Sequence, residues 1–187
     1  MSGPVRHTPI GEYVQALAST AAVPGGGSAA AVAAAMGCGL IGMVARLSAR
    51  RAKDPASAAT LEQLVPEAEA LADRLMTLSQ DDVDAYRAVV TARREGAAAE
   101  ALAAANLRAA EVPLETARAA AAAIALHRRL QPLAWSMTAS DADAAGLLLG
   151  AGFRAALANV AVNLPELKGE ARDRIQRALV ELQRTNS

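Results

Sequence analysis

Three glycines followed by a serine, Gly25, Gly26, Gly27 and Ser28, form the most distinctive short motif of this sequence. Glycines leave backbone N–H groups accessible, and a helix beginning at Ser28 adds the positive end of its dipole. Such a site could hold a carbonyl, a carboxylate or another electron-rich group. Because no lysine follows the glycines as in a P-loop, the motif does not support binding of nucleotide phosphates. A tight turn followed by a capping serine explains the same residues without any ligand.

An acidic run, DDVD at residues 81–84, is the second candidate for chemistry. Asp82 and Tyr86 are four residues apart, so on a helix an acid and a phenol share one face and could reach the same ligand. A carboxyl group surrounded by apolar helices has a raised pKa and can act as a general acid or base near neutral pH. The alternative interpretation of the run is a solvated acidic patch.

Further polar residues stand in or beside apolar segments. Ser140 and Asp141 begin such a segment, where helix capping also explains them. Asn159 and Asn163 are four apart on the same apolar helix, where each amide needs a partner in a neighbouring backbone or in a ligand.

A small basic cluster, Arg50, Arg51 and Lys53, ends an apolar segment. Such cations suit the negative end of a helix dipole, and they could also bind the anionic tail of a ligand. His7 and His127 have no recognisable partners in the sequence, and we expect both at the surface.

Helices must position these groups, because apolar residues recur at helical spacing and capping residues precede them. Ser28 is predicted to cap the second helix, Thr60 to cap the third, and Pro113 to kink or split the fourth. The expected helices span residues 10–19, 28–50, 60–96, 97–131, 140–164 and 165–184.

Composition predicts one all-α domain covering residues 1–187. The chain is 53% hydrophobic but only 2% aromatic, which favours closely packed helices over a sheet. We expect a single bundle of about six to seven helices. The helices at 28–50 and 140–164 are apolar nearly all round and should be central or at a subunit interface, so a homodimer is expected.

The charge balance and the cysteine count exclude several classes of protein. Lys plus Arg and Asp plus Glu both number 19, so no net field attracts nucleic acid. The uncharged stretch between Glu12 and Arg46 is long enough for a membrane span, but the PGGG break predicts a buried helix and no membrane association. Cys38 cannot form an internal disulfide, and no Cys/His cluster predicts zinc, as expected for a cytoplasmic protein.

Taken in order, four motifs resemble the cyclodeaminase/cyclohydrolase family of folate one-carbon metabolism over residues 10–165. The family includes formimidoyltetrahydrofolate cyclodeaminase and methenyltetrahydrofolate cyclohydrolase. The motifs are PGGGSAAAVAAAMGCGLIGMVARLS, DDVDAYRAVV, VPLETAR and SDADAAGLLLGAGFRAALANVAVNL. Family members usually have Leu-Pro-Lys after the acidic helix, where this chain has ARREG at 92–96, and a Gly-Asn pair before the Ser-Asp, where it has PLAWSMTA at 132–139.

The resemblance implies an all-helical subunit that dimerises and binds a tetrahydrofolate derivative as its substrate, without a metal. It implies Asp82 as the catalytic carboxylate and Asp141 as a second acid at the reaction. Arg51 and Lys53 would hold the benzoylglutamate end of the folate. The residues implied to bind the folate are Gly25, Gly26, Gly27, Ser28, Arg51, Lys53, Tyr86, Ser140 and Asn159.

The expected activity is hydrolysis of 5,10-methenyltetrahydrofolate to formyltetrahydrofolate, or deamination of 5-formiminotetrahydrofolate to methenyltetrahydrofolate. One alternative is transfer of the folate-borne carbon to another acceptor, because Trp135 in the altered segment could stack on a flat second substrate. A second alternative is a helical scaffold without catalysis, which predicts no folate binding.

Overall fold

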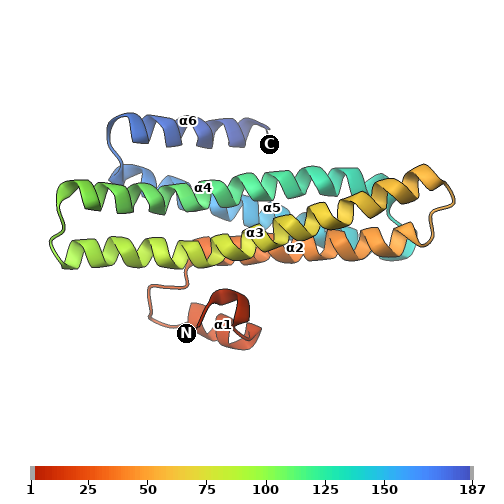
Figure 1. Cartoon of the computed structure of the whole chain (residues 1–187), viewed down its shortest axis with the longest axis horizontal. Coiled ribbons are helices and arrows are strands. Elements are labelled where there is room, and N and C mark those ends of the chain that lie inside the picture. Colours follow the sequence, from red (N-terminus) through yellow and green to blue (C-terminus); the bar gives the residue numbers. More distant parts are fainter. Residues whose placement is uncertain (1–2, 186–187) are drawn as a thin grey trace.

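The computed structural model describes residues 3–185, which form six α-helices joined by short turns and include no strand (Figure 1). The all-α class predicted from composition is therefore confirmed. The helices are α1 (Ile10–Leu17), α2 (Gly26–Ala49), α3 (Pro55–Arg94), α4 (Ala99–Leu130), α5 (Ala139–Asn163) and α6 (Gly169–Thr185). Four 3₁₀ turns accompany them: η1 (Val5–His7), η2 (Gln131–Leu133), η3 (Ser136–Thr138) and η4 (Leu164–Glu166).

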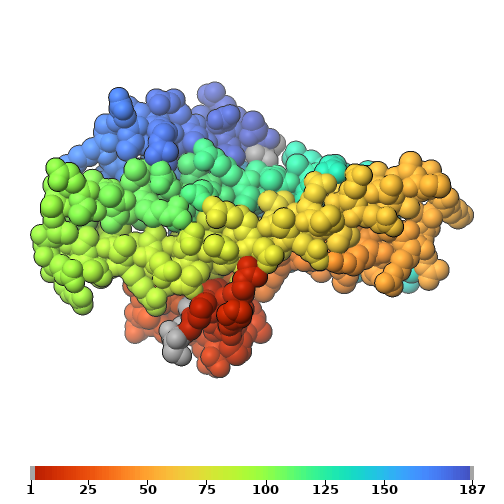
Figure 2. All heavy atoms as spheres, in the orientation of Figure 1, coloured from red at the N-terminus to blue at the C-terminus, as the bar shows by residue number. Residues whose placement is uncertain are grey.

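Helices α2 to α5 make an elongated bundle in which α2 packs against both α3 and α5, and α4 packs against the same two helices. The core between them contains fully buried residues such as Ile41, Leu75 and Leu149. Figure 2 shows α6 lying along one side of the bundle and the N-terminal segment projecting from the other. Helix α6 is amphipathic and buries Ile175 and Leu179.

Small residues let α2 and α5 approach closely, as the glycine-rich and alanine-rich sequence predicts. A Cβ atom on Gly152 would lie 2.7 Å from the Ala30 carbonyl oxygen, and one on Gly37 would lie 2.7 Å from Cγ of Leu149. Larger residues at these two positions would push the helices apart. Glycine is therefore required here by packing.

Helix α2 packs against α3, α4 and α5, whereas α5 is covered on only part of its surface. Leu147 and Val162 on α5 are 75% and 70% exposed, and Ala151, Arg154 and Ala158 between them are exposed too. We call the four apolar residues Leu147, Ala151, Ala158 and Val162 the α5 stripe, and the exposed Arg154 lies among them. The apolar character of the stripe is unexplained within one chain, so the predicted subunit interface stays a prediction.

Two segments within residues 3–185 are long and apolar enough to cross a membrane by length and composition, namely Gly26–Ala49 and Ser136–Glu166. The core helix of a soluble protein meets the same criteria. In the first segment, 67% of the apolar window is buried inside the bundle, as expected for such a core helix.

Two helices begin earlier than the capping motifs predict. Helix α2 starts at Gly26, and Ser28 lies fully buried inside its first turn, so the predicted cap at Ser28 is wrong. Helix α3 starts at Pro55 because the Asp54 carboxylate accepts hydrogen bonds from two backbone N–H groups of the first turn. The hydroxyl of Thr60, the predicted cap, instead donates to the Ala56 carbonyl.

Three other local predictions are corrected by packing. Helix α4 continues through Pro113, which is buried in the core, so the predicted split does not occur, because tertiary contacts outweigh the hydrogen bond that proline removes. The alternative of a kink stays a prediction. Helix α5 has no side-chain cap, and its first residue is Ala139, so Ser140 does not cap it. His127 is buried, with Nε2 2.8 Å from the Ala142 carbonyl oxygen, which contradicts the predicted surface position.

Candidate functional site

A cleft of about 380 Å³ opens where the N-terminus of α2 meets the second half of α3, the first half of α4 and the end of α5. The glycine motif and the acidic motif, more than fifty residues apart in the sequence, both line it and contact each other there. The structure therefore brings together the two motifs that the sequence singled out first.

Helix α3 supplies one wall of the cleft through a single stripe of side chains. Asp82, Tyr86, Val89 and Arg93 all line the cleft. Their spacing of four, three and four residues keeps them on one helix face. Asp82 and Tyr86 thus share a face as their spacing predicts, and Tyr86 is 43% exposed in the open cleft.

The glycine motif supplies the part of the cleft next to Asp82, where the absence of side chains permits close approach. A Cβ atom on Gly27 would lie 2.0 Å from Oδ1 of Asp82, and one on Gly26 would lie 3.3 Å from Nδ2 of Asn159. Any side chain at position 27 would therefore displace the carboxylate. Gly25, Gly26 and Gly27 line the cleft beside Asp82.

Ser28 positions Asp82 and does not itself line the cleft. Its backbone N–H donates a 2.9 Å hydrogen bond to Oδ2 of Asp82. Its hydroxyl, which is fully buried, lies 2.9 Å from the Tyr13 hydroxyl and 2.8 Å from the Ser79 hydroxyl. In this structure Ser28 thus ties α1, α2 and α3 together behind the carboxylate, and its predicted contact with substrate stays a prediction.

Burial raises the pKa of the Asp82 carboxyl above its ordinary value, although the hydrogen bond from the Ser28 N–H lowers the pKa in part. The direction agrees with the expectation for a carboxyl group among apolar helices. A carboxylate with a raised pKa is a stronger base than an exposed one, and its acid form persists to higher pH. Asp82 is therefore suited to accept a proton from a bound reactant and to return it.

The other acids of the DDVD run point elsewhere. Asp81 accepts a 2.9 Å hydrogen bond from Arg108, and Asp84 accepts one of 3.0 Å from Gln80. Neither lines the cleft. The acidic run thus contains one carboxylate in the cleft and two in ion pairs or hydrogen bonds outside it.

Two asparagines of α5 complete the wall next to the glycines. Asn159 donates to the Ala155 carbonyl at 2.8 Å, and Asn163 donates to the carbonyls of Ala109 and Asn159, each at 2.9 Å. Both side chains also line the cleft. The sequence left open whether these amides bind a neighbouring backbone or face a ligand. In the structure their nitrogens donate to backbone carbonyls, and the same two residues line the cleft.

Besides Ser28, four predicted site residues do not line this cleft: Arg51, Lys53, Ser140 and Asp141. The 24 residues of α2 span about 36 Å. The α2–α3 turn and the start of α5 consequently lie at the far end of the bundle (Figure 1). Within one chain the structure does not bring these residues to Asp82, and their contact with substrate stays a prediction.

Trp135 lies at that same distant end. Its ring contacts the Arg51 guanidinium, 5.1 Å from ring centroid to Cζ, and its backbone N–H donates to the Ser48 hydroxyl at 2.8 Å. Trp135 therefore does not border the cleft of its own chain. Trp135, which motivated the alternative of a second, flat substrate, therefore lies away from Asp82.

Three polar residues of the cleft were not predicted from the sequence, namely Arg93, Asn106 and Glu166. Arg93 was detectable, because it continues the spacing of Asp82 and Tyr86 along one face. Asn106 and Glu166 come from α4 and η4, and no local pattern connects them with the acidic motif. Nη2 of Arg93 lies 2.7 Å from Oε2 of Glu166.

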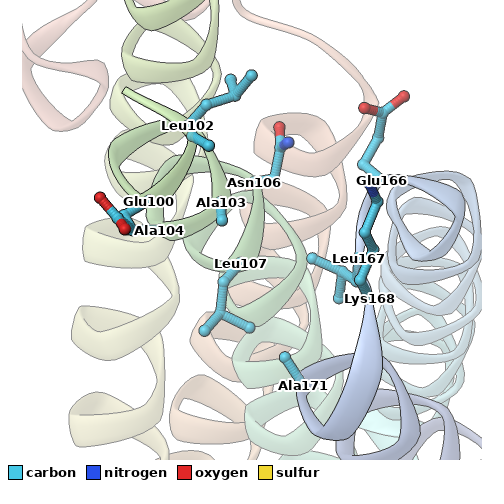
Figure 3. A pocket seen from close by; sticks show the side chains of 11 residues that line it. Glu100, Leu102, Ala103, Ala104, Asn106, Leu107, Glu166, Leu167, Lys168 and Ala171 are labelled. Carbon is cyan, nitrogen blue, oxygen red and sulfur yellow. The ribbon is translucent and has the colours of Figure 1, made fainter. Parts of the chain in front are cut away.

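A second groove, of about 560 Å³, adjoins the cleft between α4 and the η4–α6 connection. Asn106 and Glu166 line both spaces. Figure 3 shows the polar ends of these two side chains at one end of the groove, with Leu107 and Ala171 toward the other. Among residues 3–185, no group of three or more His, Cys, Asp or Glu side chains is arranged to hold a metal ion.

Comparison with known proteins identifies relatives of this chain. A family model described as formiminotransferase-cyclodeaminase matches residues 9–181. The chain is 34% identical over 170 residues to a methenyltetrahydrofolate cyclohydrolase of Methylorubrum extorquens, an alignment that covers 87% of this chain and 82% of that protein. It is 32% identical over 195 aligned positions to the formimidoyltransferase-cyclodeaminase of Sus scrofa, covering 94% of this chain but only 35% of that protein.

A solved structure extends the similarity to three dimensions. The crystal structure of formiminotetrahydrofolate cyclodeaminase from Thermotoga maritima matches with a TM-score of 0.89 and 28% identity, over 96% of this chain and 90% of that one. The resemblance noted in the sequence motifs is thus confirmed across nearly the whole chain. This chain belongs to the formiminotransferase-cyclodeaminase family.

Proposed function

We propose that this chain hydrolyses 5,10-methenyltetrahydrofolate to formyltetrahydrofolate, with Asp82 as the group that transfers the proton. Membership of the family makes it a folate one-carbon enzyme of the cyclohydrolase or cyclodeaminase type. Hydrolysis is placed first because the Methylorubrum relative, named for that reaction, aligns over 82% of its own length. The observation that carries the proposal is the buried Asp82 carboxyl, held by the Ser28 N–H at one wall of the cleft.

The reaction needs a base and then an acid at one position. Methenyltetrahydrofolate carries an electrophilic amidinium carbon between two nitrogens. Water attacks this carbon and transfers one proton to the Asp82 carboxylate, which forms a neutral adduct. The adduct's hydroxyl proton leaves to solvent as the formyl C=O forms. The bond from carbon to one ring nitrogen breaks, and that nitrogen takes the proton held by Asp82.

Burial of Asp82 supports both proton transfers, the one from water and the one to the leaving nitrogen. The raised pKa makes the carboxylate a better base toward water, and it keeps the resulting acid available for the leaving nitrogen. The hydrogen bond from Ser28 and the contact with Gly27 fix the carboxylate in one orientation. Proton transfer by a positioned side chain of this kind contributes about 10² to 10⁴ in rate.

Deamination of 5-formiminotetrahydrofolate is the second candidate, and the similarity to the Thermotoga structure favours it. The same carboxyl would then protonate ammonia as it leaves. Both reactions share methenyltetrahydrofolate as substrate or product. Analysis of products from each starting folate distinguishes the two directions, and a product formed only with a further acceptor would support the transfer alternative.

The proposal is tested by following the near-ultraviolet absorbance of methenyltetrahydrofolate with purified protein. We expect the wild type to remove the signal faster than buffer and Asp82→Asn to lose at least about 100-fold of that rate. Asp81→Asn is the matched control, because it changes the adjacent acid, which pairs with Arg108 outside the cleft. Full activity in Asp82→Asn, or equal loss in both variants, contradicts the assignment.

We also propose that the chain functions as a homodimer that buries the α5 stripe. Four exposed apolar residues on one helix, among them Leu147 and Val162, support this contact. If the twofold axis of such a dimer crosses α5 at right angles, the two copies of α5 run antiparallel. The start of the partner's α5, with Ser140 and Asp141, would then approach the end of α5 where Asn159 lines the cleft, and Arg51 and Lys53 lie at that same end of the partner.

A cytoplasmic location is part of the same proposal. Cys38 is a free thiol buried in α2, and it requires no oxidising compartment.

A further inference from the structure

An ion pair joins two of the side chains that line the cleft. Arg93 near the end of α3 and Glu166 in η4 lie 2.7 Å apart, and both line the cleft. Their side chains are 52% and 50% exposed. An ion pair that is this exposed contributes little to stability, so a competing anion can replace the carboxylate at modest cost.

The distance between Arg93 and Asp82 determines how long a ligand must be to contact both residues. Eleven residues of α3 separate them, which is about 16 Å along the helix axis on the same face. A ligand with its reacting atom at Asp82 reaches Arg93 only if it is extended and carries an anion at its far end. A planar pterin alone does not fulfil this requirement, whereas a pterin joined through a benzoyl group to glutamate does.

Glu166 has space to move aside. Its side chain borders the adjoining groove of about 560 Å³ as well as the cleft, next to Asn106 (Figure 3). Lys168 lines that groove and offers a cation to a displaced carboxylate. Rotation of Glu166 into the groove would therefore free the Arg93 guanidinium to bind a ligand in the cleft, while the Glu166 carboxylate pairs with Lys168.

We propose that Arg93 binds a glutamate carboxylate of the folate substrate, and that Glu166 occupies this place in the unliganded enzyme. A guanidinium pairs with a carboxylate through two parallel hydrogen bonds, which suits the end of the folate. The identity of the ligand rests on the proposed function, whereas the anion site itself rests on the Arg93–Glu166 pair. Arg93 thus acts in substrate specificity and not in the proton transfer.

The test compares folates with and without glutamate. For Arg93→Met we expect a KM for methenyltetrahydrofolate raised by at least about tenfold, an unchanged kcat, and an unchanged KM for the analogue that ends at the benzoyl group. For Glu166→Gln we expect a KM lowered by up to about fivefold. Arg94→Met is the control, since Arg94 is 75% exposed and pairs with the neighbouring Glu95.

A double variant separates direct binding from simple charge balance. If Arg93 only neutralises Glu166, adding Glu166→Gln to Arg93→Met returns the KM to the wild-type value. If Arg93 binds the ligand, the KM of the double variant stays raised. Equal KM values for Arg93→Met and Arg94→Met would overturn the inference and leave the proposed function intact.

A binding experiment without turnover keeps the two proposals distinguishable. Para-aminobenzoylglutamate is titrated into each variant and followed by chemical-shift changes, with para-aminobenzoate as the ligand that lacks glutamate. Arg93-dependent binding of the first ligand alone supports the anion site even where no methenyltetrahydrofolate is hydrolysed. Failure of the wild type to prefer the first ligand overturns the inference.

Discussion

Gly27 and Asp82 are in such close contact that a Cβ atom at position 27 would lie 2.0 Å from Oδ1 of the carboxylate. The neighbouring residue, Ser28, donates its backbone N–H to Oδ2 of the same carboxylate at 2.9 Å. The start of α2 thus contacts both oxygens of Asp82. The glycine motif therefore determines where the reacting group of the cleft lies.

Gly27→Ala should abolish most activity while keeping the fold. The added methyl group must displace the Asp82 carboxylate, and a shift of about 1 Å at a reacting group costs about 100-fold in rate. The measurement is kcat with methenyltetrahydrofolate, accompanied by circular dichroism. Gly39→Ala in the same helix is the control, because a Cβ atom there meets no heavy atom within 4 Å. Wild-type kcat in Gly27→Ala would contradict the proposed role of this contact.

The pH dependence of stability should report the raised pKa of Asp82. Burial raises the pKa of this carboxyl in the folded chain above its ordinary value of 3.8. Between the two pKa values the folded chain binds more protons than the unfolded chain, so the free energy of unfolding falls as pH rises. We therefore expect the difference in free energy of unfolding, wild type minus Asp82→Asn, to fall with rising pH above 3.8 and to level off above the raised pKa.

Urea denaturation of both proteins at pH steps between about 3 and about 7 gives this difference directly. Other titrating groups are common to the two proteins and cancel. A difference that stays constant or increases with pH would show that Asp82 is not destabilised as a buried anion.

Gly152→Ala should lower the free energy of unfolding by about 1–3 kcal/mol, because overpacking in a tight core forces backbone shifts. A Cβ atom there would lie 2.7 Å from the Ala30 carbonyl oxygen, which belongs to the backbone of α2 and cannot rotate away. Gly150→Ala is the control on the same helix, since its Cβ would lie 3.4 Å from the flexible end of Arg154. Urea denaturation gives the free energy of unfolding of both variants. Equal values for Gly152→Ala and Gly150→Ala would contradict the close α2–α5 contact.

Leu147→Glu should convert a homodimer into a monomer. Leu147 is 75% exposed in the α5 stripe, and a carboxylate there would be buried without a partner in the proposed interface. Analytical ultracentrifugation gives the mass of each form. Val90→Glu on α3, at a residue that is 45% exposed outside the stripe, should leave the mass unchanged. A wild-type monomer, or a dimer that persists in Leu147→Glu, would refute this interface.

Local patterns in the sequence determined the helical class and one face of the cleft. The spacing of apolar residues predicted the helices of the bundle, and the four-residue spacing placed Asp82 beside Tyr86 on α3. The same rule extended by seven residues from Tyr86 reaches Arg93, which belongs to none of the four sequence motifs. These features were predictable because each depends only on the 3.6-residue period of a helix.

Capping motifs predicted helix ends less well, because several residues compete for the same function. Asp54 caps α3 in place of Thr60, and Gly26 starts α2 in place of Ser28. In the second case the Ser28 hydroxyl is taken by Tyr13 and Ser79, two partners from other helices. Contacts between helices thus determined which of several local signals was used.

By itself, the sequence determined that this chain is all-helical, that its small residues permit close helix contacts, and that an acid and a phenol share one helix face. The tertiary structure decided which side chains meet. It placed Gly27 against Asp82 and Arg93 against Glu166, and it left Arg51 and Asp141 away from the cleft. The physical reason is that helical period is a property of neighbouring residues, whereas the pairing of distant residues depends on how whole helices pack and where each one begins.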